Sequence, residues 1–94
     1  MTTMRQIQLT EWGDESVLHK ANVPIPSPVR GHVLIKTVAA GVNPIDLTTR
    51  KGLGPAAQLA DPSYKPFVPG WDVAGTVVAT SGDYTGFKLG DGVF

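Results

Sequence analysis

The sequence contains no cysteine among its 94 residues. Disulfides, thiolate nucleophiles and every cysteine-containing zinc or iron–sulfur site are therefore excluded. A chain of this length can build only one small hydrophobic core. Since no disulfide reinforces that core, we expect an intracellular, cytoplasmic setting rather than a secreted one.

The chain also lacks an excess of charge of either sign. Lysine plus arginine and aspartate plus glutamate number 8 each, so the formal net charge is zero. A nucleic-acid-binding surface needs a basic excess or stripe, so no nucleic-acid partner is expected. Runs of apolar residues fall far short of the ~20 that a membrane helix requires, and the first residues lack the apolar stretch of a signal peptide. We therefore expect no membrane partner.

The residues that are present suit a folded domain rich in turns. Hydrophobic residues make up 41%, and 11 glycines with 8 prolines predict frequent turns and few long helices. Alternating or β-branched segments predict strands, and a proline-rich stretch predicts an extended connector. The predicted strands span residues 5–10, 17–23, 32–40 and 73–80, with another beginning at 93; the connector spans 24–28 and a turn spans 81–83. Gly75, inside a strand, predicts a bulge or the close approach of another group.

One short helix is indicated after the third strand. Asn43 is a favoured N-cap residue, and Pro44 suits the first helical position. Asp46 lies in the first turn, where the helix dipole favours an anion. Gly52 suits the position after the C-terminus, so the helix should span residues 44–51.

The stretch after this helix, residues 53–69, contains four prolines and is expected to be an irregular loop with no regular element. Just before it, Gly52-Leu-Gly-Pro-Ala-Ala57 matches the pattern of a dinucleotide-binding turn, and Asp72 lies 20 residues beyond Gly52. Such a turn must follow a buried strand and open a helix, whereas polar residues of helical character precede this one. The sequence therefore predicts no phosphate-binding loop.

Neither a metal site nor a nucleophile can be assigned from the sequence. His19 and His32, the two histidines, lie on separate predicted strands without the spacing of metal ligands. No serine–histidine–acid arrangement can be recognised either.

Polar residues around the short helix are the candidates for a site. Asn43 and Asp46 are three residues apart and lie near one face of the helix, with Thr48 close by. They either present polar groups to a cleft or serve only the helix end, Asn43 as cap and Asp46 as partner of the dipole. Trp71 is expected in the core or in a cleft wall, and Asp72 in a turn. Local physics leaves these alternatives open.

Three segments, taken in order, resemble the medium-chain dehydrogenase/reductase family. They are Gly31-His-Val-Leu-Ile-Lys-Thr-Val-Ala-Ala-Gly-Val-Asn-Pro-Ile-Asp46, Gly70-Trp-Asp-Val-Ala-Gly-Thr-Val-Val78 and Phe87-Lys-Leu-Gly-Asp-Gly-Val-Phe94. The chain is most similar to the zinc-independent, quinone-oxidoreductase-like branch, which includes enoyl reductases. Zinc-dependent relatives have cysteine where Asn43 stands and Gly-His-Glu at positions 70–72, so the resemblance implies that no zinc is bound.

The resemblance implies a mainly β, GroES-like fold, a partly open β-barrel with one or two short helices. Residues 1–94 would be the N-terminal part of the catalytic domain, with the Rossmann cofactor domain outside them. The expected whole is an NADPH-dependent oxidoreductase that passes a hydride to the conjugated carbonyl of a small-molecule quinone or enone. The resemblance also allows a homodimer of the full-length protein, and it implies that these 94 residues alone are inactive.

The same resemblance implies roles for four residues. Asn43, Asp46 and Thr48 are the expected catalytic residues, and Asn43, Asp46 and Trp71 are the expected cofactor-binding residues. Thr48 stands where quinone-oxidoreductase relatives often carry tyrosine, which counts against a quinone substrate. The alternative function is a non-catalytic β-barrel module for binding or scaffolding.

Overall fold

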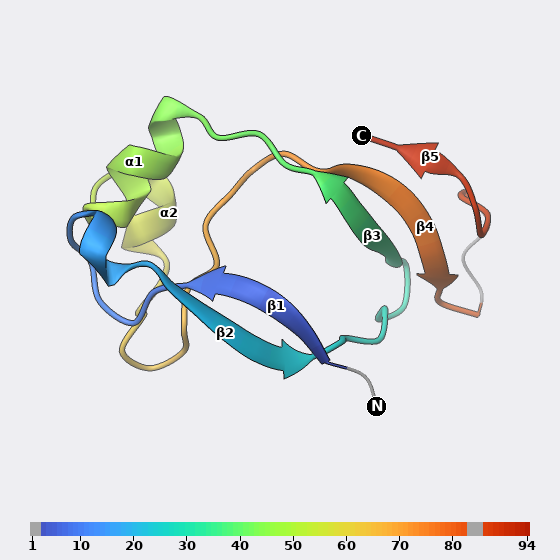
Figure 1. The fold of residues 1–94 in the computed structure, drawn as a ribbon, viewed down its shortest axis with the longest axis horizontal. Helices are drawn as coiled ribbons and strands as arrows, with labels where there is room; N and C mark the ends of the chain where they lie inside the picture. The colour runs from blue at the N-terminus through green and yellow to red at the C-terminus, as the bar shows by residue number, and fades with distance from the viewer. Residues whose placement is uncertain (1–2, 83–85) are drawn as a thin grey trace. The chain divides into compact units, whose positions relative to one another are not determined.

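The chain divides into two compact units. The computed structural model describes residues 3–82 and 86–94 (Figure 1). Unit 1 comprises residues 3–24 and 42–71, and unit 2 comprises Ile25–Gly41 and Asp72–Phe94. Residue 83, in the turn expected at 81–83, lies outside the described residues.

Unit 1 begins with an antiparallel hairpin. Strand β1 (Thr3–Gln8) pairs with β2 (His19–Pro24), and a single 3-10 turn, η1 (Glu15–Val17), precedes β2. The strand predicted over residues 17–23 is therefore wrong at its start, because Asp14 caps this turn by accepting a hydrogen bond from the Ser16 N–H. Pro24, predicted in the connector, is the last residue of β2, a position where a missing N–H is tolerated.

The helices of unit 1 follow the hairpin. Helix α1 (Pro44–Arg50) confirms the predicted helix, and Gly52 beyond it has φ of +84°. Helix α2 (Pro55–Gln58) corrects the prediction that residues 53–69 hold no regular element. Pro55 occupies the first turn of α2, where the missing N–H of proline costs no hydrogen bond. This proline therefore starts a helix, although the number of prolines in the segment predicted that no helix would form.

Unit 2 is an open antiparallel sheet in the order β3 (Val33–Ala39), β4 (Ala74–Thr80), β5 (Gly92–Val93). The register of β3 against β4 shifts between Leu34 and Ile35 and again between Thr37 and Ala39. A Cβ placed on Gly75 would lie 2.1 Å from the Lys36 carbonyl oxygen. The predicted close approach at Gly75 is thus confirmed.

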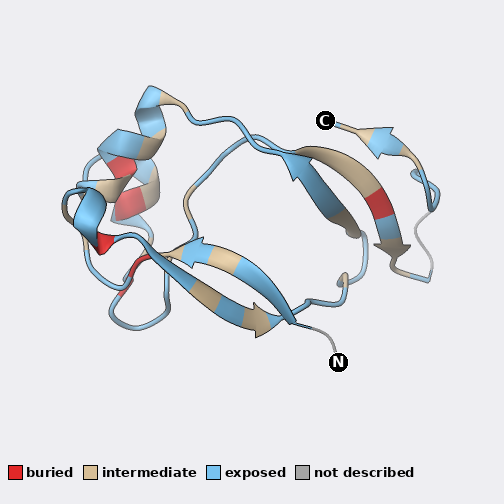
Figure 2. Cartoon of the chain, viewed as in Figure 1, coloured by how far each residue is buried: buried red, intermediate tan, exposed pale blue. Residues whose placement is uncertain are grey.

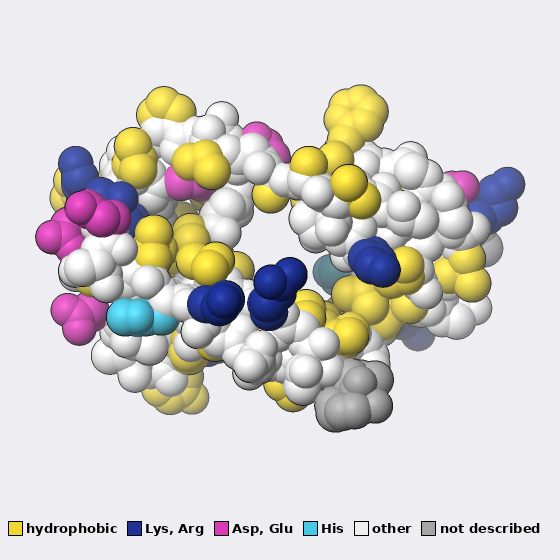
Figure 3. All heavy atoms as spheres, in the orientation of Figure 1, with side chains coloured by type: hydrophobic (Ala, Val, Ile, Leu, Met, Phe, Trp, Pro, Cys, Tyr) yellow, Lys and Arg dark blue, Asp and Glu magenta, His cyan; other side chains and the backbone are white. Residues whose placement is uncertain are grey.

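Both sheets are open, and the buried core is small. The buried hydrophobic residues of the described chain are Leu9, Val17, Ala57 and Val77 (Figure 2). Three of them lie in unit 1, and Val77 lies on the central strand of unit 2. Many large apolar side chains stay at the surface (Figure 3). The prediction of a mainly β fold with short helices is confirmed.

No helix among the described residues is long and apolar enough to cross a membrane.

Candidate functional site

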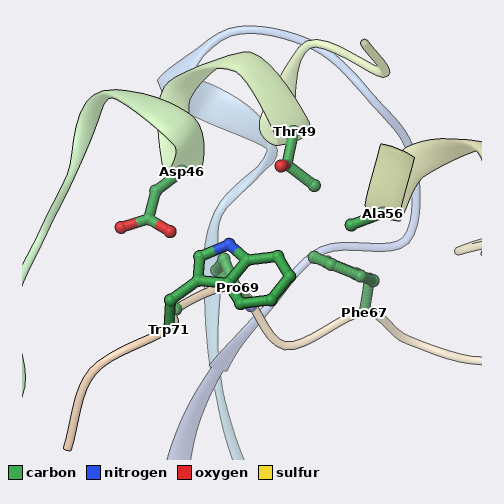
Figure 4. A pocket seen from close by; sticks show the side chains of 7 residues that line it. Asp46, Thr49, Ala56, Phe67, Pro69 and Trp71 are labelled. Carbon is green, nitrogen blue, oxygen red and sulfur yellow. The ribbon is translucent and has the colours of Figure 1, made fainter. Parts of the chain in front are cut away.

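A small pocket lies inside unit 1, between α1, α2 and the segment that ends at Trp71. Its volume is about 170 Å³. Figure 4 shows side chains from all three segments around it. The residues that line it are Asp46, Thr49, Ala56, Phe67, Pro69, Gly70 and Trp71. The lining is mostly apolar, with polar groups contributed from α1.

Asp46 is the only acidic residue in the lining. It stands at the third position of α1, and its Oδ2 accepts the Asn43 N–H at 2.9 Å, the reach-back hydrogen bond of a capping box. Its Oδ1 is buried and accepts no hydrogen bond from the described residues. One carboxylate oxygen therefore holds the helix start while the other remains unpaired.

Thr49 is the second polar residue in the lining. It lies three residues after Asp46, and so on the same face of α1. Its Oγ1 donates to the Ile45 carbonyl at 2.9 Å, and the residue is buried. With its proton used inside the helix, Thr49 offers the pocket its methyl group and lone pairs rather than a donor.

The C-terminal end of helix α1 is hydrogen-bonded to the segment before η1. Gly13 N–H donates to the Arg50 carbonyl at 2.8 Å, and Arg50 Nε donates to the Gly13 carbonyl at 3.1 Å. A Cβ on Gly52 would lie 2.9 Å from Trp12 Cγ, so the indole packs closely on this turn. These contacts hold α1 in place, and with it the side chains of Asp46 and Thr49 that line the pocket.

Phe67 forms one wall and is held through its backbone. Leu9 and Phe67 exchange two hydrogen bonds, each 2.9 Å, in an isolated antiparallel bridge. The Phe67 ring meets Trp12 edge to face, with centroids 5.5 Å apart and planes at 64°. Such aromatic pairs add stability beyond their buried area, so this wall is firm.

Trp71 continues the wall that Phe67 forms, on the side facing α1 and α2 (Figure 4), and lies largely in solvent. Trp71 is 60% exposed and lines the pocket. The sequence left open whether it lies in the core or in a cleft wall; the core position is wrong, and the cleft-wall position is confirmed. Figure 4 shows the indole nitrogen on the ring edge turned toward α1. Asp72, the next residue, belongs to unit 2 and is not in the lining; its carboxylate packs on Gly41, where a Cβ would lie 2.6 Å from Oδ2.

The four residues expected at the site divide into two pairs. The pocket brings Asp46 and Trp71 together, whereas Asn43 and Thr48 are not in its lining. Asn43 touches the site through its backbone N–H to Asp46, and Thr48 is exposed, with its hydroxyl donating to the Pro44 carbonyl at 3.3 Å. Both capping roles proposed for Asn43 and Asp46 are present.

The sequence analysis missed part of the lining. Thr49 carried a usable signal, since it lies at helical spacing from Asp46 on the same face. Phe67 and Pro69 carried none, because an irregular loop gives no periodicity from which to place a side chain. Ala56 carried none because helix α2, on which it lies, was not predicted.

A second, more open pocket of about 470 Å³ lies in unit 1 along the loop that follows α2. Its lining is Leu59, Ala60, Asp61, Tyr64, Lys65, Pro66, Phe67 and Val68. The Ser63 hydroxyl donates to Asp61 Oδ1 at 2.6 Å, and the Ser63 N–H donates to the same oxygen at 3.0 Å. These two bonds lower the pKa of Asp61 below its ordinary value.

The described residues hold no cluster of three or more histidine, aspartate or glutamate side chains that could bind a metal ion. His19 lies on β2 and His32 just before β3, in different units.

Comparison with known proteins decides the family. The alcohol dehydrogenase GroES-like domain family matches residues 29–94. The chain belongs to this family. It is 39% identical to a quinone oxidoreductase of Lama guanicoe and 40% identical to a 2-methylene-furan-3-one reductase of Solanum lycopersicum, in each case over 97% of this chain. It covers only 26% and 23% of those two proteins.

Solved structures agree with the sequence relatives. The quinone oxidoreductase from Coxiella burnetii matches 97% of this GroES-like chain with a TM-score of 0.89 and 33% identity. A mycobacterial protein, Rv1454c, solved in complex with NADPH, matches 95% with a TM-score of 0.77 and 39% identity. This chain covers 28% and 26% of those two structures. The predicted partial GroES-like fold and the quinone-oxidoreductase-like branch are confirmed.

Proposed function

We propose that this GroES-like chain is the substrate-side part of an NADPH-dependent oxidoreductase. The observation that carries the proposal is a likeness to oxidoreductases along almost the whole chain, including a neighbour that binds NADPH. Residues 1–94 are then the N-terminal part of a catalytic domain, and the cofactor domain lies outside them. This part supplies one side of the reaction site, formed by the residues that line the pocket beneath α1.

The residues of the pocket suit the ring end of NADPH and not its phosphates. A lining of apolar and aromatic side chains with one carboxylate residue at its side fits a flat ring. The glycine-containing segment at 52–54 follows α1 and leads into the four-residue α2, so it cannot form a strand–turn–helix cradle for pyrophosphate. NADPH, when bound, supplies a hydride with its electron pair to a conjugated carbonyl.

The chain's own residues orient the reacting groups. Asp46 and Trp71 lie against the ring of cofactor or substrate, and Asn43 positions Asp46 through its backbone N–H. Thr48 is an outer polar residue of the same helix. Trp71, Phe67 and Pro69 exclude water from the ring face, which strengthens electrostatic contacts inside the pocket.

We also propose that no zinc takes part. Asn43 offers an amide and Trp71 an indole, neither of which is a usual zinc ligand. They stand where zinc-dependent members of the resembled family have cysteine and histidine. The reaction then depends on positioning and on the cofactor's hydride.

The test is NADPH oxidation by the complete protein encoded by the reading frame that contains these residues. We expect loss of NADPH absorbance on adding a quinone or an enone, and none with a saturated ketone of similar size. In parallel, the 94-residue chain alone is titrated with NADPH. If the complete protein reduces neither the quinone nor the enone, the proposed reaction is wrong. If the 94-residue chain alone binds NADPH at micromolar concentration, the proposal that the cofactor domain lies outside these residues is wrong.

One observation favours the alternative, a non-catalytic binding or scaffolding module. Leu59 and Tyr64, on the loop after α2, are 90% and 89% exposed. An exposed apolar loop can bind another protein. Light scattering of the chain distinguishes the two, because a scaffold of the co-chaperonin kind forms a ring of many copies and the proposed reductase part does not.

A further inference from the structure

Two separate parts of the chain enclose the pocket beneath α1, and one short segment is bonded to both. Helix α1 lies on one side of the pocket, and the segment that carries Phe67 lies on the other (Figure 4). Residues 9–13 contact each side through hydrogen bonds. Leu9 exchanges two bonds of 2.9 Å with Phe67. Gly13 exchanges bonds of 2.8 and 3.1 Å with Arg50, the last residue of α1. The separation of the two sides therefore depends on this segment.

Trp12 joins the same two sides through its side chain. Its indole meets the Phe67 ring edge to face, with centroids 5.5 Å apart. Its Cβ, Cγ and Cδ1 also lie 3.1, 2.9 and 3.0 Å from the place that a Cβ on Gly52 would take, two residues after the end of α1. Trp12 itself is not among the residues that line the pocket. It therefore acts on a bound molecule through the positions of α1 and Phe67.

We propose that Trp12 is a positioning residue that sets the width of the pocket, and thereby the size of the hydride acceptor that the complete protein prefers. The inference deepens the proposed function and rests on it for the acceptor. An indole is large and rigid, and an aromatic pair has preferred geometries. A smaller aliphatic side chain would leave space behind the Phe67 ring and against Gly52, into which both sides can move. Because the pocket holds only about 170 Å³, a small movement changes its volume by a large fraction.

A purely stabilising role for Trp12 leads to a different result. A loss of stability lowers the folded fraction of the protein, which lowers the rates with all acceptors by the same factor. A change in pocket width instead alters the rates with narrow and wide acceptors unequally, since selectivity is the ratio of two kcat/KM values. The ratio for two acceptors, measured on one sample, therefore separates the two roles.

The first test compares 1,4-benzoquinone with 1,4-naphthoquinone as acceptors for the complete protein, with the uncatalysed rate subtracted. We expect Trp12→Leu to raise kcat/KM for the two-ring acceptor, relative to the one-ring acceptor, by about threefold or more, which is modest for a change in pocket fit. Trp12→Phe keeps an aromatic ring against Phe67 and should stay within about twofold of the unmodified ratio. If the protein reduces only enones, cyclohex-2-enone and 4-phenylcyclohex-2-enone replace the quinones.

Gly75→Ala is the matched control for a general loss of stability. It brings a methyl group against the Lys36 carbonyl oxygen in unit 2, whereas the pocket lies within unit 1. It should lower the rates with both acceptors in parallel and leave their ratio unchanged. An unchanged ratio in Trp12→Leu overturns the proposal, and so does a ratio in Gly75→Ala that moves as far.

A second measurement needs no turnover, so failure of the proposed reaction is distinguishable from failure of this inference. Crystal structures of the complete protein and of its Trp12→Leu variant give the distance from the Thr49 Cα to the centre of the Phe67 ring. We expect this distance to increase by about 0.5 Å or more, the tolerance within which a functional site must be held. If the protein reduces no acceptor, the proposed reaction is wrong, and this distance alone decides whether Trp12 sets the width of the pocket. A distance that does not change overturns the proposal.

Discussion

At Asp46, one side chain serves both local structure and the pocket. The sequence predicted its place at the start of α1 because capping depends on neighbours three residues away. It left open whether Asp46 had any role beyond the helix end. The pocket that Asp46 lines also needs Phe67 and Trp71, more than 20 residues further along the chain, and no local pattern predicts that meeting.

Two aspartates of the chain share a local motif that lowers their pKa. In both Asp14-Glu-Ser16 and Asp61-Pro-Ser63 the serine hydroxyl and N–H donate to the same aspartate oxygen. The hydroxyl bond is the largest cause, so the pKa of each aspartate lies below the ordinary 3.8. We expect Ser16→Ala to raise the pKa of Asp14 and leave that of Asp61 unchanged, and Ser63→Ala to do the reverse.

The measurement is an NMR titration of the side-chain carboxyl carbons. Because each folded pKa is depressed, the stabilisation is present above the unfolded pKa and is lost as pH falls through the folded pKa. Unfolding at pH 3 and pH 7 should therefore differ less in the double variant than in the unmodified chain. A pKa of Asp14 that does not move in Ser16→Ala contradicts the assigned cause.

At the scale of elements, strands and helix starts were predictable where the signal is local. β3, β4 and α1 follow from β-branched runs and a capping pattern. The segment 17–23 was wrong at its start because Asp14 and Ser16 form a turn that competes with strand pairing. Helix α2 was not predicted because four prolines in one stretch argue against regular structure, whereas Pro55 stands at the first helical position, where proline is tolerated.

The contact between β3 and β4 at Gly75 leads to a prediction about stability. In Gly75→Ala the new methyl would meet the Lys36 carbonyl, which is backbone and cannot move aside without breaking the strand pairing. We expect a loss of about 1–3 kcal/mol or more in the free energy of unfolding, as for overpacked sites. Gly92→Ala, in the same sheet with nothing within 4 Å, is the control and should change little. Equal urea midpoints for the two variants would contradict this account.

Gly52, in the turn after α1, can be compared with Gly31, a glycine that has nearly the same φ. Gly31 and Gly52 have φ of +83° and +84°, so alanine at either costs about 1–2 kcal/mol from the left-handed conformation. Only Gly52 also has Trp12 within 2.9 Å of the added Cβ. We expect Gly52→Ala to be the more destabilising, with a shift in Trp12 fluorescence that Gly31→Ala lacks. Equal losses of unfolding free energy in the two variants would show that the indole contact has no cost.

At the scale of the whole chain, the sequence predicted the family and the class of fold but not the distribution of burial. Ordered motifs predict a family because they preserve residue types and spacing together. Burial depends on which distant segments meet, so the β-branched residues predicted a strand at 32–40 but not that Val38 on this strand is exposed. The division into two units, which assigns Gly41 and Val42 to different units, has no signal in composition.

The proposed absence of zinc is tested on the complete protein. We expect dialysis against EDTA to leave the rate of NADPH oxidation unchanged, because Asn43 and Trp71 carry side chains that bind zinc poorly and the described residues hold no cluster of histidine and carboxylate ligands. A zinc-dependent alcohol dehydrogenase, treated in the same way, should lose activity and regain it when zinc is added. If the protein itself loses activity to EDTA and zinc restores it, residues outside these 94 bind a catalytic metal.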